Sequence, residues 1–167
     1  MSVRQIARAV VQEVAAVKRW MYRHGRPNVV MRYANRLDAL VYGSRWLSPR
    51  RTAVLKVPGR RTGRRTSIPI VVTEHRGAGY LVSMLGPDAN WVRNVRAADG
   101  QASLYRRGRE IPIVLQEVPP EERAEILRRY AALAPAARPH LGLGPAAPLE
   151  RFQQIAPGHP VFLIVAR

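Results

Sequence analysis

From residue 52 to residue 118 the sequence consists of short runs of apolar and β-branched residues that are separated by glycine and proline. Runs of this length and composition are typical of β-strands, because such side chains pack well on a pleated sheet. Five strands are expected, over residues 52–57, 66–74, 79–85, 101–106 and 110–118. Strands that follow one another through short turns usually pair antiparallel, so this region predicts an antiparallel sheet rather than a doubly wound one.

Helices are expected on both sides of this β region and once within it. Before it, apolar residues recur at steps of three and four over residues 2–24 and 29–47, which predicts two amphipathic helices. Within it, residues 87–98 have helical spacing, and Asp88 is a candidate N-cap. After it, the sequence predicts a helix that follows Pro120, a loop over residues 134–148, a short helix over 149–156 and a sixth strand over 159–167.

Six strands with helices at the ends predict an α+β fold whose mostly antiparallel sheet closes into a small barrel, with a helix packed outside the barrel. The 167 residues are enough for one domain, so we expect a single domain over residues 1–167, with an N-terminal helical segment (1–48) and a barrel core (50–167). The longest apolar runs are far shorter than the roughly 20 residues that a membrane-spanning helix needs. The first 25 residues show no secretory signal pattern, so a cytoplasmic location is expected.

The formal net charge of +17 lies mainly in the first 65 residues, which hold 16 Lys and Arg against two acids. Such a charge is compatible with nucleic acid, an anionic membrane or an anionic ligand as partner. No aromatic platform is interleaved with the basic residues and no recognition module is evident, so a specific nucleic-acid partner is not expected and remains only a rival reading. The first helix either packs on the barrel or makes a peripheral contact with anionic membrane, because Trp20 and Tyr22 stand beside Lys18 and Arg19.

The segment GRRTGRRTSIP, residues 59–69, places four arginines in seven positions. Glycines at positions 59 and 63 allow backbone N–H groups to converge on an anion, and guanidinium groups bind phosphate and carboxylate well. The spacing of these glycines excludes a nucleotide P-loop. A solvated, arginine-rich hairpin is the simpler alternative.

A second segment, GYLVSMLGPDANWVRNVRA at residues 79–97, favours an anion-binding turn over a solvated hairpin. A strand is expected to end near Ser83, Gly86 frees the backbone for a turn, and Trp91 and Asn94 then lie one helical turn apart on the same face. Taken alone, Trp91 is most simply a core aromatic residue.

Together the two segments resemble the deazaflavin-dependent nitroreductase family, split β-barrel oxidoreductases that use the reduced 8-hydroxy-5-deazaflavin coenzyme. The family's turn of glycine, two basic residues, Ser or Thr, and glycine is matched by residues 59–63, and its later proline by Pro69. Its strand that ends in a small residue, followed by a Trp-x-x-Asn helix, is matched by Ser83, Trp91 and Asn94. The resemblance covers roughly residues 50–118.

The resemblance implies an FMN-binding-like split β-barrel and an enzyme that passes a hydride from reduced coenzyme F-420 to a small conjugated, nitro or quinone-like acceptor. It implies that the basic turn holds the coenzyme's phosphate and acidic tail, while the turn that begins at Ser83 and the following helix line the deazaflavin ring. The cofactor-binding residues so implied are Arg60, Arg61, Thr62, Gly63, Arg65, Thr66, Pro69, Ser83, Met84, Leu85, Gly86, Trp91 and Asn94. The sequence departs from the family at Thr66, where many relatives carry arginine, and at Met84, where they often carry lysine.

No catalytic residue is assigned, because in hydride transfer the chemistry belongs to the cofactor. No metal site is expected either, since His24, His75, His140 and His159 are far apart and lack acidic partners at metal-ligand spacing; each reads as a surface or loop histidine. FMN or haem on the same barrel, and a coenzyme carrier without turnover, remain alternatives. The sequence leaves both a monomer and a homodimer open, with a small-molecule substrate as the expected partner.

Overall fold

The computed structural model describes residues 51–166, so the two helices predicted before residue 48, and the membrane contact suggested for the first, lie outside the described residues. The six predicted strands are confirmed. They are β1 (Thr52–Pro58), β2 (Arg65–His75), β3 (Ala78–Val82), β4 (Gln101–Arg106), β5 (Arg109–Glu117) and β6 (Val161–Ala166). The largest difference is at β3, which ends three residues earlier than expected because a turn begins at Ser83.

The helical elements are α3 (Asn90–Ala97), η2 (Pro120–Glu122), α4 (Ala124–Leu133), η3 (Pro135–Ala137), α5 (Arg138–Leu141), α6 (Leu149–Ile155) and η4 (Ala156–Gly158). Two details of the sequence-based prediction are wrong. Ala89, not Asp88, is the N-cap of α3, and the Asp88 carboxylate pairs with Arg93 instead of a backbone N–H group. The expected loop over residues 134–148 contains η3 and α5, because a proline in the first turn of each supplies the φ angle that a helix start needs.

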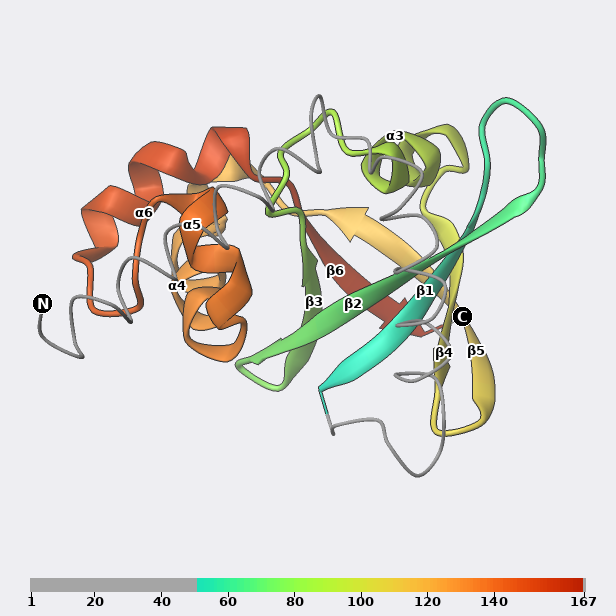
Figure 1. The fold of residues 1–167 in the computed structure, drawn as a ribbon, viewed down its shortest axis with the longest axis horizontal. Helices are drawn as coiled ribbons and strands as arrows, with labels where there is room; N and C mark the ends of the chain where they lie inside the picture. Colours follow the sequence, from blue (N-terminus) through green and yellow to red (C-terminus); the bar gives the residue numbers. More distant parts are fainter. Residues whose placement is uncertain (1–50, 167) are drawn as a thin grey trace, which may run out of the picture.

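The strands form a closed antiparallel barrel in the order β1-β2-β3-β6-β5-β4, as Figure 1 shows. Side chains alternate across each strand, so β1 directs Ala53, Leu55 and Val57 into the barrel core. All three are fully buried. The barrel predicted from the strand count is therefore present, and it places the residues between these three on the outer face of the strand.

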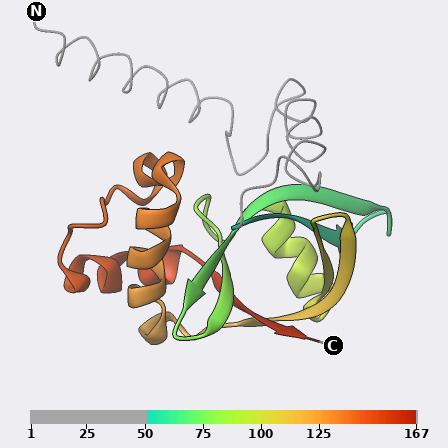
Figure 2. The same ribbon diagram turned by 90° about the horizontal axis from the view of Figure 1, so that it is seen from below.

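Helix α3 closes one end of the barrel. Its buried residues Val92 and Val95 join the same hydrophobic cluster as the inward-facing residues of β1, together with Ala89 just before the helix. In Figure 2 this helix is seen inside the ring of strands. The helix that the sequence predicted inside the β region is thus held against β1.

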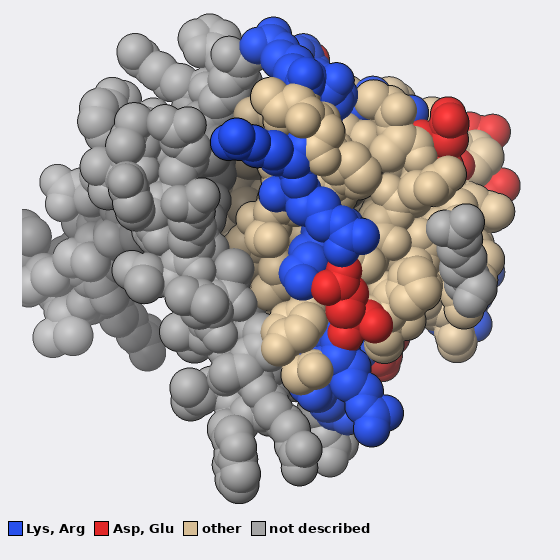
Figure 3. Space-filling model, turned by 90° about the vertical axis from the view of Figure 1, so that its right-hand side faces the viewer, with Lys and Arg blue, Asp and Glu red and all other residues tan. Residues whose placement is uncertain are grey.

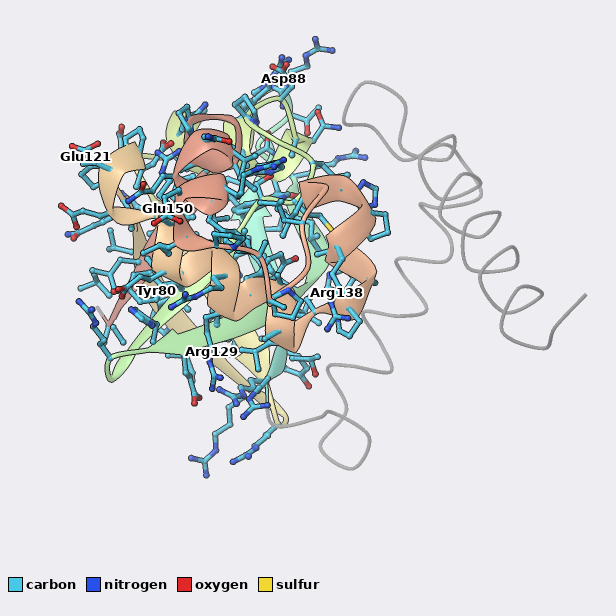
Figure 4. All side chains as sticks on the ribbon, turned by 90° about the vertical axis from the view of Figure 1, so that its left-hand side faces the viewer. Tyr80, Asp88, Glu121, Arg129, Arg138 and Glu150 are labelled. Atoms are coloured by element: carbon cyan, nitrogen blue, oxygen red, sulfur yellow. The ribbon has the colours of Figure 1, made fainter. Side chains whose placement is uncertain are left out.

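The remaining helices pack outside the barrel, as the sequence analysis expected. Helices α4 and α6 contact each other and α4 covers β2 and β3, and Leu127 and Phe152 are fully buried in a second hydrophobic cluster. Figures 1 and 4 show these helices gathered on one side of the molecule, at the far side from the tip of the β1–β2 hairpin. Burying one such side chain contributes about 2 kcal/mol, so this second cluster is a substantial part of the fold's stability.

Candidate cofactor-binding site

The basic turn joins β1 to β2 and is tightly closed by its own backbone. The Gly59 N–H donates to the Arg64 carbonyl (2.9 Å), and the Gly63 N–H donates to the Gly59 carbonyl (2.8 Å). Gly63 has φ +67°, and a Cβ on Gly59 would lie 3.0 Å from the Arg64 oxygen. Both positions therefore favour glycine, and the intervening side chains are held on a compact, exposed loop.

One arginine of this turn connects the two predicted motifs. The buried Asn94 side chain on α3 accepts hydrogen bonds at Oδ1 from the Arg60 backbone N–H (3.3 Å) and from Arg60 Nη1 (3.0 Å). Asn94 is only 5% exposed, so its amide oxygen needs such donors, because an unpaired buried polar group is costly. The structure thus brings the basic turn and the Trp-x-x-Asn helix into direct contact.

The other arginines of the turn differ in what they contact. Arg65 Nη1 lies 2.7 Å from Glu110 Oε1 on β5, so its charge is partly balanced within the chain. Arg61 and Arg64 are exposed, and no hydrogen bond or ion pair of their side chains involves another residue in the range 51–166. Figure 3 shows basic side chains lined up along this side of the molecule, with acidic groups interrupting the line.

The last predicted residues of this segment belong to strand β2. The Thr66 hydroxyl donates to the Val57 carbonyl (3.0 Å), which supports the hairpin. Pro69 is opposite Val54 on β1 and lies between Ile68 and Ile70, which pack against the barrel core, so its ring is on the outer face of the strand. Thr62 is exposed at the tip of the turn.

A second turn follows β3 at Ser83. The buried Ser83 hydroxyl donates to the Gly86 carbonyl (2.8 Å), and the Ser83 N–H donates to the Pro160 carbonyl (2.9 Å). Gly86 has φ +83°, and a Cβ there would lie 3.3 Å from the Gly158 oxygen. This turn is therefore fixed both by its own side chain and by the segment that leads into β6.

His159 also contacts this turn, which the sequence analysis did not foresee. Its ring Nδ1 lies 3.1 Å from the Ser83 carbonyl oxygen, so Nδ1 carries the hydrogen and donates. Burial lowers the pKa of His159 below its ordinary value, which favours the neutral ring. The two residues are 76 positions apart, and no local sequence signal could have connected them.

The apolar residues of the second segment surround the turn. Leu85 and Trp91 pack against the barrel core, while Met84 packs against the cluster beneath α4 and α6. The Trp91 ring is 5.4 Å from the Phe162 ring, centroid to centroid, and is tilted by 59°. Trp91 is only half-buried, so it is at once a core residue and a part of the surface next to the turn.

These residues fit a coenzyme that has a planar ring and an anionic tail. The donors of the basic turn are cationic and exposed, as binding to phosphate or carboxylate requires. The Arg60–Asn94 contact joins the turn to the helix that carries Trp91, so an anion-binding part and an apolar part are adjacent. Among the described residues, no group of three or more His, Asp or Glu side chains is arranged to hold a metal ion.

A cleft of about 640 Å³ lies elsewhere, between the β2–β3 hairpin, the start of α4 and α6. Tyr80 and Glu121, both labelled in Figure 4, line it, and none of the thirteen residues implied as cofactor-binding does. Within residues 51–166, no helix has the length and hydropathy to cross a bilayer.

The chain was compared with known protein families and structures. The family model described as F420H2-dependent quinone reductase matches residues 27–139. A sequence search of curated proteins gave no match.

Solved structures superpose on this chain at low sequence identity. One described as a domain-swapped dimer superposes with a TM-score of 0.51 at 18% identity, covering 81% of this chain and 96% of the other. Protein Atu2129 from Agrobacterium tumefaciens gives a TM-score of 0.50 at 17% identity, covering 70% of this chain and 48% of the other. An F420-H2 dependent reductase, FDR-A, gives 0.46 at 21% identity, covering 69% and 94%.

The family match spans more than half of the chain and includes both the basic turn and the Trp91 helix. It agrees with the resemblance drawn from these two motifs and with the six-stranded barrel. The chain therefore belongs to the F420H2-dependent quinone reductase family and is a deazaflavin-dependent oxidoreductase that uses coenzyme F-420.

Proposed function

We propose that this reductase transfers a hydride to a small quinone-like acceptor, with conjugated and nitro compounds of similar shape as further substrates. The bound reduced coenzyme supplies the hydride. The observation that carries the proposal is the contact of Arg60 with Asn94, because it sets a cationic turn against the helix that bears Trp91. A ring-bearing anion needs both surfaces at once.

The thirteen residues implied by the family resemblance are proposed as the coenzyme site, with distinct roles. The guanidinium groups of Arg60, Arg61 and Arg65 would bind anionic oxygens, which they can approach with two parallel N–H groups. The turn from Ser83 to Gly86 and the Trp91 ring would hold the deazaflavin ring and exclude water from one side of it. These groups position the reactants and require no general base of their own.

The proposal is tested by titrating the protein with reduced coenzyme F-420 and by assaying turnover with a panel of quinones and nitro compounds. Saturable binding is expected, and the double variant Arg60→Ala/Arg61→Ala should weaken it by more than about 100-fold, at about 1.5–3 kcal/mol for each charged hydrogen bond lost. Arg129→Ala is the matched control, because Arg129 is an exposed arginine on α4, on the helical side of the molecule (Figure 4).

Two results would contradict the proposal. One is the absence of detectable coenzyme binding at high protein concentration. The other is equal weakening by the Arg129 control, which would mean that only net charge matters. Binding without reduction of any acceptor in the panel would support a coenzyme carrier instead of a reductase.

A further inference from the structure

Glu110 is the centre of a charged cluster on the outer face of the barrel. Its carboxylate accepts a hydrogen bond from Lys56 Nζ (2.6 Å), from Arg65 Nη1 (2.7 Å) and from the Ser103 hydroxyl (2.6 Å). The four residues come from four strands, β1, β2, β4 and β5. Three donors thus surround one carboxylate group, and in this structure that group is the side chain of Glu110.

The strand registers fix this cluster. Lys56 is opposite Ser103 in the β1–β4 pair, and Ser103 is on the face of β4 away from Leu104, which packs in the barrel core. The Lys56 ammonium also lies 4.9 Å from the centre of the Tyr105 ring, which further restricts it. Lys56 and Ser103 are thus placed by the barrel, while Arg65, whose side chain is 67% exposed, reaches the cluster from the start of β2.

The carboxylate itself is less constrained. The Glu110 side chain is 34% exposed and sits next to the β4–β5 turn, so it can rotate into water without moving a strand. The hydrogen bonds from Lys56 and Ser103 lower the pKa of Glu110 to about 2, so the group is negatively charged throughout the neutral range. An incoming anion therefore meets a charge of its own sign directly beside Arg65.

We infer that Lys56, Arg65 and the Ser103 hydroxyl form a carboxylate subsite for the acidic tail of the coenzyme, and that Glu110 occupies this subsite as a competing internal carboxylate. The inference rests on the proposed coenzyme site, because Arg65 is one of its residues and links the cluster to the basic turn. A tail carboxylate must displace Glu110 to reach these donors, so Glu110 weakens the binding of the tail and limits how much of its charge the protein recognises.

The test compares coenzyme preparations whose tails carry few or many carboxylates, binding to the full-length protein. Glu110→Gln keeps the side-chain shape and removes the charge. We expect it to tighten binding of the highly charged form by roughly fivefold, as one unscreened surface charge would, and to change binding of the other form less. Glu122→Gln is the matched control, since it removes one exposed negative charge in η2, outside the cluster.

Arg65→Gln tests the route of the effect. If Glu110 acts by occupying Arg65 and its neighbours, Glu110→Gln should give a much smaller gain in the Arg65→Gln background than alone. Melting temperatures of all variants show whether each is folded, and Glu110→Ala, which leaves the subsite open, should repeat the gain of Glu110→Gln.

The outcomes separate this inference from the proposed function. If the wild-type protein binds neither form of the coenzyme, the proposed site itself fails. If wild type binds both forms, but Glu110→Gln behaves like Glu122→Gln or the gain is the same for both tails, the coenzyme site stands and the competition by Glu110 is refuted.

Discussion

At the scale of single residues, the site depends on polar contacts between segments that are distant in the sequence. The Arg60–Asn94 pair joins two motifs that sequence analysis had already placed in one site, and the structure adds that they touch. The pairs of Arg65 with Glu110 and of His159 with Ser83 were not foreseen. Glu110 is an exposed strand residue and His159 a loop residue, and neither residue type signals its contact until the strand registers are known.

His159 gives a prediction at this scale. His159→Asn retains an N–H donor near the Nδ1 position, so it should keep the turn at Ser83 intact and change coenzyme affinity by less than about threefold. His159→Ala leaves the Ser83 carbonyl without this donor and should lower the free energy of unfolding by about 1 kcal/mol. The measurements are a coenzyme titration and a urea denaturation curve for each variant.

His159→Gln is the control, because its longer side chain places the donor near the position of Nε2 rather than Nδ1. It should resemble the alanine variant in stability. If the asparagine variant loses as much affinity and stability as the alanine variant, then the hydrogen bond to Ser83 is not what His159 contributes.

At the scale of elements, the strands could be predicted because glycine and proline in the sequence mark the turns between them. Arg76-Gly77 and Arg107-Gly108 connect paired strands through two residues that both have positive φ, the geometry of the favoured hairpin turn. The stretch over residues 134–148 could not be read in the same way. Its prolines and alanines suit a loop as well as a short helix, and packing of Ala137 and Leu141 into the outer cluster decides for η3 and α5.

Two glycines with nearly equal φ angles give a prediction at this scale. Gly100, between α3 and β4, has φ +78°, and Gly108, between β4 and β5, has φ +79°. A Cβ at Gly108 meets no atom within 4 Å, so Gly108→Ala should cost only the conformational penalty of about 1–2 kcal/mol. A Cβ at Gly100 would overlap the Leu115 carbonyl, so Gly100→Ala should cost several kcal/mol or prevent folding.

Urea denaturation of the two variants, or their soluble yield where one does not fold, checks this prediction. The pair isolates the close approach of Gly100, in the turn between α3 and β4, to Leu115 on β5, since the backbone strain is the same in both. Equal destabilisation by the two substitutions would show that Leu115 moves aside and that this junction is not tightly packed.

At the scale of the whole molecule, one carboxylate connects the barrel, the helix that closes it and the helices outside. Glu117, at the end of β5, accepts hydrogen bonds from Arg96 on α3 (2.7 and 2.9 Å) and from Arg123 Nη2 just before α4 (3.2 Å). Arg123 is 5% exposed and also donates to the carbonyls of Val118 and Ala156. Hydrophobic patterning predicts the barrel strands, α3 and the outer helices separately, but it carries no information on the polar contacts that join them.

This connection predicts how stability depends on pH. The hydrogen bond from Arg96 lowers the pKa of Glu117 in the folded protein, and the charge of Arg123 acts in the same direction. A carboxylate with a lowered pKa stabilises the folded state above the pKa of the unfolded chain, about 4.3, and this stabilisation is lost as the pH falls through the folded value. At pH values below about 5 the free energy of unfolding should therefore decrease. Glu117→Gln should be less stable than wild type at pH 7 and should lose less stability on acidification.

Urea denaturation at a series of pH values from 7 to 3 measures both slopes, with Glu122→Gln as the exposed control. Parallel curves for wild type and Glu117→Gln would mean that the acid sensitivity of this protein comes from other carboxylates, of which Glu110, with its pKa of about 2, would be the next to test.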